Sequence, residues 1–149
     1  MRSKAVSLFA MLVIAGSLAN NTADAQSVGE ITFDIPFEFN VAGNTHPAGE
    51  YLIALRPSRI DAGLLLIRSA RGDDSVFFWT NDAPADSISS LSKLVFNRYG
   101  DRHFLTQIRT RGENMWRQVQ MTASERSVRR ESSQRGVEAK TVAVVGNMK

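Results

Sequence analysis

The chain has 149 residues and a formal net charge of +3 at pH 7. This length suits one domain, and the small excess of positive charge excludes a surface dedicated to a polyanion, so we expect no nucleic-acid partner. The chain contains no cysteine, which excludes disulfide bonds and leaves stability to a packed core.

The first 25 residues have the pattern of a bacterial export signal. Two basic residues precede an apolar run from Ala5 to Gly16, and small residues occupy the −3 and −1 positions in Ala23-Asp24-Ala25. The apolar run is shorter than the ~20 residues of a membrane-spanning helix. We therefore expect cleavage after Ala25 rather than an uncleaved anchor. The expected product is a β-rich domain over residues 26–149 without a membrane span, located in the periplasm or outside the cell.

Alternation of apolar and polar residues predicts a long first strand between Glu30 and Val41. Its phenylalanines Phe33, Phe37 and Phe39 share one face. Because Pro36 cannot donate a hydrogen bond to a neighbouring strand, we expect the strand to bend or break there.

Short apolar runs separated by turn residues predict the middle of the domain to be β as well. The predicted strands are Glu50–Arg56, Leu64–Ser69, Ser75–Thr80, Lys93–Tyr99, His103–Thr110 and a short one within residues 114–120. The segment Asn81–Ser92 is rich in small and polar residues, and we expect it to be a loop.

The pattern changes near the C-terminus. Thr122 followed by Glu125 forms a capping box and predicts a surface helix over about residues 122–135, ending before Gly136. The β-branched run Val137–Val145 predicts a closing strand. About seven or eight short strands with one late helix indicate a mainly all-β fold, either an antiparallel β-barrel or a β-sandwich.

The stretch RYGDRH is the densest group of polar side chains, and it lies between two alternating runs. We interpret it as a tight hairpin loop that sets the strand register, because glycine and aspartate tolerate a left-handed backbone. The alternative interpretation is a contact site for a ligand or a partner. Its candidate residues are Arg98, Tyr99, Asp101, Arg102 and His103.

No motif for catalysis or cofactor binding is present. The two histidines, His46 and His103, lack the spacing of a metal site, and no phosphate loop, dinucleotide fingerprint or nucleophile elbow occurs. We expect no metal, no cofactor and no catalytic residues, although a hydrolase with an unrecognised site stays open as an alternative.

The aromatic residues leave two interpretations open. They fill the core, or they line the interior of a lipocalin-like barrel that carries a small apolar ligand. The candidate lining residues are Phe33, Phe37, Phe39 and Trp79.

Four stretches together, IPFEF, PAGEY, LLLIR and KLVFNRYGDRHFL, resemble a family of small exported bacterial proteins common in acidobacterial genomes. The resemblance extends from about Ile35 to Arg126, and its most specific part lies between Leu94 and Leu105. It implies a β-rich exported protein and adds no chemistry. His46 and His103 depart from the family pattern, in which an apolar residue and a tyrosine are usual, and this argues against a shared histidine ligand.

These patterns favour a non-catalytic binding or structural module of the cell envelope. The expected partner is another envelope protein or a surface polymer. Three surfaces are candidate contacts: the Asn81–Ser92 segment, the RYGDRH hairpin and the arginine-rich face of the predicted helix.

Overall fold

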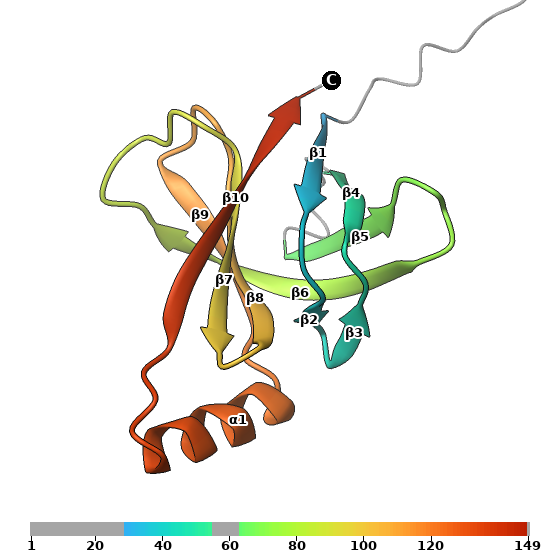
Figure 1. Ribbon diagram of the computed structural model, residues 1–149. Helices are drawn as coiled ribbons and strands as arrows, with labels where there is room; N and C mark the ends of the chain where they lie inside the picture. The colour runs from blue at the N-terminus through green and yellow to red at the C-terminus, as the bar shows by residue number, and fades with distance from the viewer. Residues whose placement is uncertain (1–28, 55–62, 149) are drawn as a thin grey trace, which may run out of the picture.

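The computed structural model describes residues 29–54 and 63–148. The predicted export signal and the last residues of the predicted strand Glu50–Arg56 lie outside these ranges. The described residues form a mainly β protein, in which a closed eight-stranded antiparallel barrel carries one helix near the C-terminus, followed by a final strand (Figure 1). The prediction of a β-barrel or β-sandwich is therefore confirmed as a barrel.

The elements follow one another in the order that the sequence patterns predict, with the predicted first strand divided in two and one short strand added. They are β1 (Glu30–Ile35), β2 (Phe39–Val41), β3 (Asn44–His46), β4 (Gly49–Ala54), β5 (Leu64–Ser69), β6 (Ser75–Pro84), β7 (Lys93–Tyr99), β8 (Arg102–Arg109), β9 (Met115–Val119), α1 (Ala123–Gln134) and β10 (Lys140–Met148).

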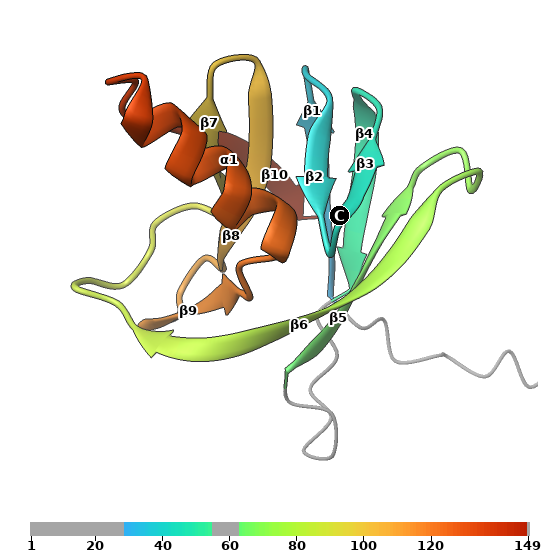
Figure 2. The same cartoon turned by 90° about the horizontal axis from the view of Figure 1, so that it is seen from below.

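The barrel closes through the pairing of β8 with β9. Around the ring the strands run β1, β4, β5, β6, β9, β8, β7 and β10, and β10 pairs again with β1. Every pairing within this ring is antiparallel. The helix α1 lies against the outside of the barrel beside β7 and β8, as Figure 2 shows from below.

The long strand β6 corrects one prediction. The segment Asn81–Ser92 was expected to be a loop, but its first four residues continue β6 and pair with β9. The side chains there are small and polar because this part of β6 is mostly exposed. Backbone hydrogen bonding to β9, which side-chain patterning does not reveal, holds it in the sheet.

The first hairpin is bent, and the predicted break near Pro36 is confirmed. The strands β1 and β4 pair within the barrel wall. Beyond the break, β2 and β3 pair with each other, and β2 adds in parallel to β8 through Phe39 with His103 and Asn40 with Phe104. Residues 39–46, which we call the tip, thus connect the first hairpin to β8, on the edge of β8 that β9 occupies farther along the strand.

The barrel interior is filled by the apolar side chains that the alternation places inward. From the first hairpin, Ile31, Phe33, Ile35 and Phe39 are completely buried. They belong to one cluster with apolar residues of the other strands, such as Phe96. Full burial of a large apolar side chain stabilises the fold by about 1.5–3 kcal/mol.

The helix begins as the capping pattern predicts. Thr122 has an extended backbone, and its hydroxyl oxygen accepts a hydrogen bond from the Glu125 amide. Val128 anchors the helix by packing on Tyr99 and Phe104 of the β7–β8 hairpin. The other buried residue of the helix is Glu125, an unexpected position for a carboxyl group.

Candidate functional site

The RYGDRH stretch is a two-residue turn between β7 and β8. Tyr99 pairs with Arg102 across it, and Gly100 has a φ of 62°, which is the left-handed backbone that glycine adopts at little cost. Arg98 donates to the carbonyl of Gly100 at 2.6 Å and lies 3.6 Å from the fully exposed carboxylate of Asp101. The predicted hairpin loop is therefore confirmed.

The candidate contact residues of this hairpin do not converge on one point. Tyr99 packs under the helix with Phe104 and Val128. His103 points to the other side, where its ring stacks on Phe37 at a centroid distance of 3.9 Å. The remaining candidate, Arg102, is exposed and donates to the hydroxyl of Ser124 at 3.3 Å.

The four aromatic candidates separate in the same way. Phe33 and Phe39 are completely buried, and the half-buried Phe37 contacts the ring of Phe96 edge to face at 5.2 Å. Trp79, a candidate lining residue of the ligand-carrier alternative, is 57% exposed. Its neighbour Phe78 is buried, and consecutive side chains of a strand point to opposite faces, so Trp79 must face outward.

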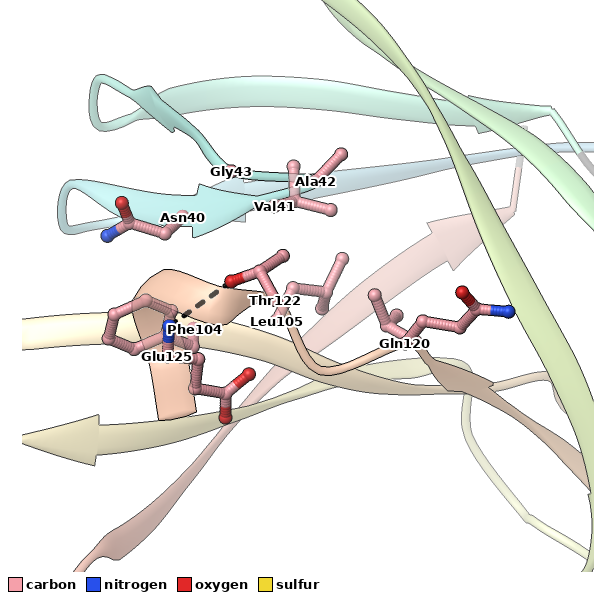
Figure 3. Close-up of a pocket in the computed structure, with 10 residues that line it drawn as sticks. Asn40, Val41, Ala42, Gly43, Phe104, Leu105, Gln120, Thr122 and Glu125 are labelled. Atoms are coloured by element: carbon pink, nitrogen blue, oxygen red, sulfur yellow. Dashed lines mark hydrogen bonds between the residues drawn. The ribbon is translucent and has the colours of Figure 1, made fainter. Parts of the chain in front are cut away.

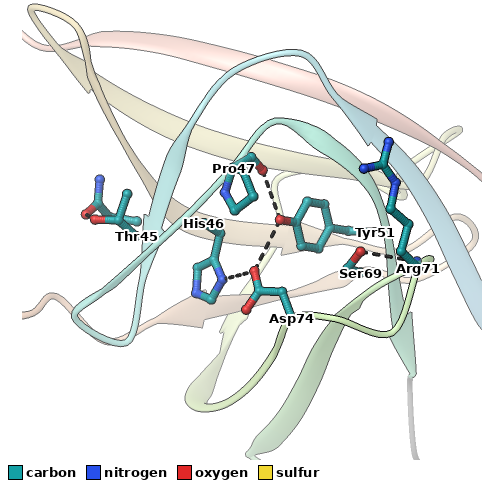
Figure 4. A network of polar contacts seen from close by, with 8 residues as sticks. Thr45, His46, Pro47, Tyr51, Ser69, Arg71 and Asp74 are labelled. Atoms are coloured by element: carbon teal, nitrogen blue, oxygen red, sulfur yellow. Dashed lines mark hydrogen bonds and ion pairs between the residues drawn. The ribbon is translucent and has the colours of Figure 1, made fainter.

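The densest polar network lies elsewhere, between β3, β4 and the loop before β6 (Figure 4). His46 Nδ1 lies 2.5 Å from the carboxylate oxygen Oδ2 of Asp74. The Tyr51 hydroxyl lies 3.3 Å from the same oxygen and 2.9 Å from the carbonyl oxygen of Pro47. One carboxylate thus ties the start of β4 and the end of β3 to the β5–β6 loop.

Burial sets the chemistry of this network. His46 is 3% exposed and Tyr51 is 1% exposed, and His46 Nε2 is buried without a hydrogen-bond partner. Burial, together with the nearby negative charge of Asp74, raises the pKa of Tyr51 to about 12. The Tyr51 phenol is therefore a hydrogen-bond donor throughout the physiological pH range.

Sequence reasoning missed this network. His46 and Asp74 are 28 residues apart, and each lies in a turn-rich stretch where solvation is the simpler interpretation. Only the pairing of β4 with β5 brings the two turns together. The adjacent aspartates Asp73 and Asp74 before a strand were the one feature of the sequence that could have indicated a polar contact here. They gave no indication of which residue the contact would involve.

Two of the cavities in the described part of the chain lie beside the polar network and beside the tip. One, of about 180 Å³, lies beside Tyr51 and is lined by the 47–51 and 69–73 segments. The other, shown in Figure 3, lies between the turn of the tip, β8 and the start of α1, and its volume of about 10 Å³ leaves room for about one water molecule.

Burial, and secondarily the negative charge of Glu125, raises the pKa of Tyr99 as well. A carboxyl group and an imidazole are also perturbed by their surroundings. Burial raises the pKa of Glu125 above its ordinary value, although Asn97 donates to its carboxylate at 3.4 Å. Burial, and secondarily the positive charge of Arg98, lowers the pKa of His103. In both cases the protein favours the uncharged form of the side chain.

Within the described ranges, no three histidine, aspartate or glutamate side chains cluster as a metal site would require. No helix among the same residues is both long and apolar enough to cross a membrane. Comparison of the chain with protein-family models, curated proteins and solved structures finds no match. The site must therefore be interpreted from its own geometry.

Proposed function

We propose that the protein is an exported, non-catalytic binding module of the bacterial cell envelope, and that it binds a partner protein through the outer face of β5 and β6. The observation that carries this proposal is the exposure of two large aromatic side chains on neighbouring outward positions of β6. Phe77 is 62% exposed and Trp79 is 57% exposed.

The aromatic pair is part of a larger apolar surface. Leu66 pairs with Phe77 and Leu64 pairs with Trp79 across the β5–β6 ladder, so all four side chains lie on the same outer face. A contiguous exposed apolar patch is typical of an interaction site. Trp and Phe are enriched in the centres of protein interfaces, where they supply much of the binding energy.

The composition of this face favours a protein over a surface polymer. Leucines lie opposite both rings on β5, and the polar outward side chains of β6, Ser75 and Asn81, lie only at the two ends of the aromatic pair. The nearest outward charge on β5, Arg68, is already paired with Glu30 at 3.0 Å. An apolar partner surface would bury Phe77, Trp79 and the two leucines together.

Catalysis is disfavoured by the same burial that orders the polar network. A general base must come within hydrogen-bond reach of a substrate proton. The His46 side chain, which carries the best-oriented imidazole, is 4% exposed, and substrate would have to displace the tip to reach it. Both histidines in the described part of the chain are buried, and this burial disfavours the hydrolase alternative.

The carrier alternative has less support than the binding module. Its proposed lining residues Phe33 and Phe39 are completely buried within the core cluster. Phe39 contacts the rings of Tyr51 and Phe96 edge to face at 5.0 and 5.7 Å. Such contacts favour a filled interior.

Export rests on the pattern of the first 25 residues. Mass spectrometry of the protein isolated from its native cells tests the export signal, because cleavage after Ala25 predicts a new N-terminus at Gln26. An intact N-terminus in the cytoplasmic fraction would contradict this part of the proposal.

The binding face is tested by site-specific photocrosslinking in the native envelope. A benzophenone side chain replacing Phe77 should give a discrete adduct with one partner protein. The same probe at Val145, which is 51% exposed and lies on β10, is the matched control. The adduct should disappear when Trp79→Ser is added. Equal adducts from both positions, or an adduct indifferent to Trp79→Ser, would contradict the proposal.

A further inference from the structure

The strand β6 has different neighbours along its two halves. Residues 75–79 pair with β5, and residues 80–84 pair with β9 on the opposite edge. The Gln120 amide donates to the Trp79 carbonyl at 3.4 Å, and the contact with the β9 side ends there. Figure 2 shows the β5–β6 hairpin reaching beyond the end of β9. Among the strands of the described ranges, none pairs with the second edge of residues 75–79, which we call the open edge.

The backbone groups on the open edge belong to alternate residues of β6. The Thr80 amide donates to the Gly63 carbonyl of the β5 side at 2.6 Å. Because the residues of an antiparallel ladder bond alternately to one side and to the other, every second residue back from Thr80 bonds to β5. The residues between them, Ser75 and Phe77, therefore direct their amide and carbonyl groups to the open edge.

The open edge lacks the features by which proteins prevent unwanted strand pairing. Its sequence, SVFFW, contains no charged residue and no proline, and its register with β5 is continuous. By comparison, the edge strand β3 has only three residues, and all of them are polar. A regular apolar edge with free backbone groups is a template for the addition of another strand.

The open edge adjoins the aromatic pair of the proposed binding face. The exposed rings of Phe77 and Trp79 project from the same stretch of β6 that carries the free backbone groups. A strand added to this stretch would gain main-chain hydrogen bonds from Ser75 and Phe77, and its outward side chains would pack beside the two rings. Backbone pairing and burial of aromatic surface would therefore act together.

The end of the sheet at the β5–β6 turn is acidic. Asp73 is exposed in this turn, and the exposed side chains of Asp34 and Glu50 lie directly opposite each other on β1 and β4. None of these three carboxylates forms an ion pair with a residue that the structure describes. Arg71 is the only basic residue of the turn. A basic side chain on the partner would therefore be favoured at this end.

A second copy of this chain would not supply that basic side chain. The strand β6, with the sequence SVFFWTNDAP, contains no lysine or arginine. Antiparallel pairing of two copies through the open edge would therefore leave Asp73 without a cation. The charge of the turn favours a different protein as the occupant of the edge.

We propose that the partner protein adds an extended segment to the open edge of β6, with apolar side chains at alternate positions and a basic residue beside Asp73. This inference rests on the proposed function, because it specifies how the partner occupies the outer face of β5 and β6.

Hydrogen exchange in the protein free of partners tests whether the edge is open. We expect fast exchange at the amides of Ser75 and Phe77, and slow exchange at the amides of Val76 and Phe78, which bond to β5. Slow exchange at Ser75 and Phe77 would overturn the proposal, because the chain itself or a second copy would then cover the edge. A dependence of that protection on protein concentration would identify the second copy.

Photocrosslinking in the native envelope tests the added strand. The benzophenone probe at Phe77 is combined with Ser75→Pro, which removes an amide from the open edge and no hydrogen bond to β5. The adduct yield should fall about tenfold, whereas Ser75→Ala keeps the amide and should leave the yield unchanged. If circular dichroism shows that Ser75→Pro does not fold, Ser75→Lys introduces a charge of the kind that protects natural edges and provides the same comparison.

The outcomes separate this inference from the proposed function. An adduct that survives Ser75→Pro but disappears with Trp79→Ser would overturn strand addition and leave the binding face in place. Absence of any adduct from the probe at Phe77 would contradict the proposed function and this inference with it.

A charge reversal tests the basic residue of the partner. Asp73→Lys should lower the adduct yield about threefold, because it replaces an attraction by a repulsion. Asp101→Lys makes the same change in the exposed turn of the β7–β8 hairpin and should leave the yield unchanged. Equal yields from the two variants would overturn the assignment of a basic residue to the partner.

Discussion

The β7–β8 hairpin and the tip formed by β2 and β3 are both tight hairpins, and they meet along the edge of β8, but they are held in place very differently. The first is part of the barrel wall, and its turn projects exposed polar side chains. The second lies outside the ring and is held by buried side chains, a two-residue pairing and one carboxylate. The conspicuous polar stretch therefore forms the turn of a wall hairpin, and the inconspicuous one contributes His46 to the buried network.

The largest expected difference in stability between the two hairpins comes from removing the buried aromatic ring of the tip. Phe39→Ala should lower the free energy of unfolding by about 3–5 kcal/mol, because a completely buried ring is lost and its cavity collapses only in part. Chemical denaturation measures this change. Phe77→Ala removes the same atoms from an exposed position and should leave the midpoint almost unchanged. Equal losses in the two variants would contradict the assigned burial.

The second-largest effect is expected at the carboxylate that fastens the tip. Asp74→Ala should cost about 1–3 kcal/mol, because it leaves the buried Nδ1 of His46 without its partner, whereas the Tyr51 hydroxyl keeps the carbonyl oxygen of Pro47. It should also bring the pKa of Tyr51 down from about 12, as ultraviolet titration of the phenolate would show. Asp73→Ala, which removes the adjacent exposed carboxylate, is the control: it should leave stability unchanged and should lower the pKa of Tyr51 less than Asp74→Ala does, because the charge of Asp73 is the smallest of the contributions that raise this pKa.

Each of the two hairpin turns has a residue with a left-handed backbone, but this residue is alanine in the tip and glycine in the β7–β8 turn. Replacing the alanine by glycine should stabilise the protein, and replacing the glycine by alanine should destabilise it. The turn of the tip contains Ala42 with a φ of 51°, a left-handed backbone that strains a side chain. Ala42→Gly should therefore stabilise the protein by about 0.5–1 kcal/mol, and Gly100→Ala in the other turn should destabilise it by about 1 kcal/mol. Thermal melts of the pair at one pH measure the contrast. Changes of the same sign would contradict a left-handed backbone at one of the two positions.

A smaller, pH-dependent effect is expected where the helix lies beside both hairpins. Burial raises the pKa of Glu125, so its contribution to stability is complete below about pH 4.5 and is lost as the pH rises through the folded-state pKa. Glu125→Gln keeps an acceptor for Asn97 without the charge and should stabilise the protein at pH 7 but not at pH 4. Denaturation curves at the two pH values check this, and a gain that is independent of pH would contradict it.

The smallest effect is expected in the stretch that looks most like a site. Asp101→Asn should leave stability unchanged, because the carboxylate is fully exposed and its ion pair with Arg98 is screened by water. A thermal melt suffices to show this. A clear loss of stability would mean that the turn carries an interaction beyond its role in setting the register.

Elements that depend on neighbouring residues could be predicted from the sequence, whereas contacts between distant strands could not. The strand from Glu30 could be predicted because inward and outward positions alternate along it. The start of the helix could be predicted because Thr122 and Glu125 lie within one helical turn. The continuation of β6 beyond Thr80 could not be predicted, because its side chains are mostly polar and only backbone pairing with β9 holds these residues in the sheet. Aromatic character alone made Trp79 a candidate for the interior, whereas its position in the alternation, next to the buried Phe78, places it outside.

The sequence by itself determined the β class, the order of most elements, the helix cap and the break at Pro36, since each depends on residues that are neighbours along the chain. Only the tertiary structure decided that the barrel closes through β8 and β9, that the tip leaves the wall to reach β8, and that Asp74 meets His46 and Tyr51. These contacts join residues that are distant in the chain, and their formation depends on strand register, which no local pattern encodes.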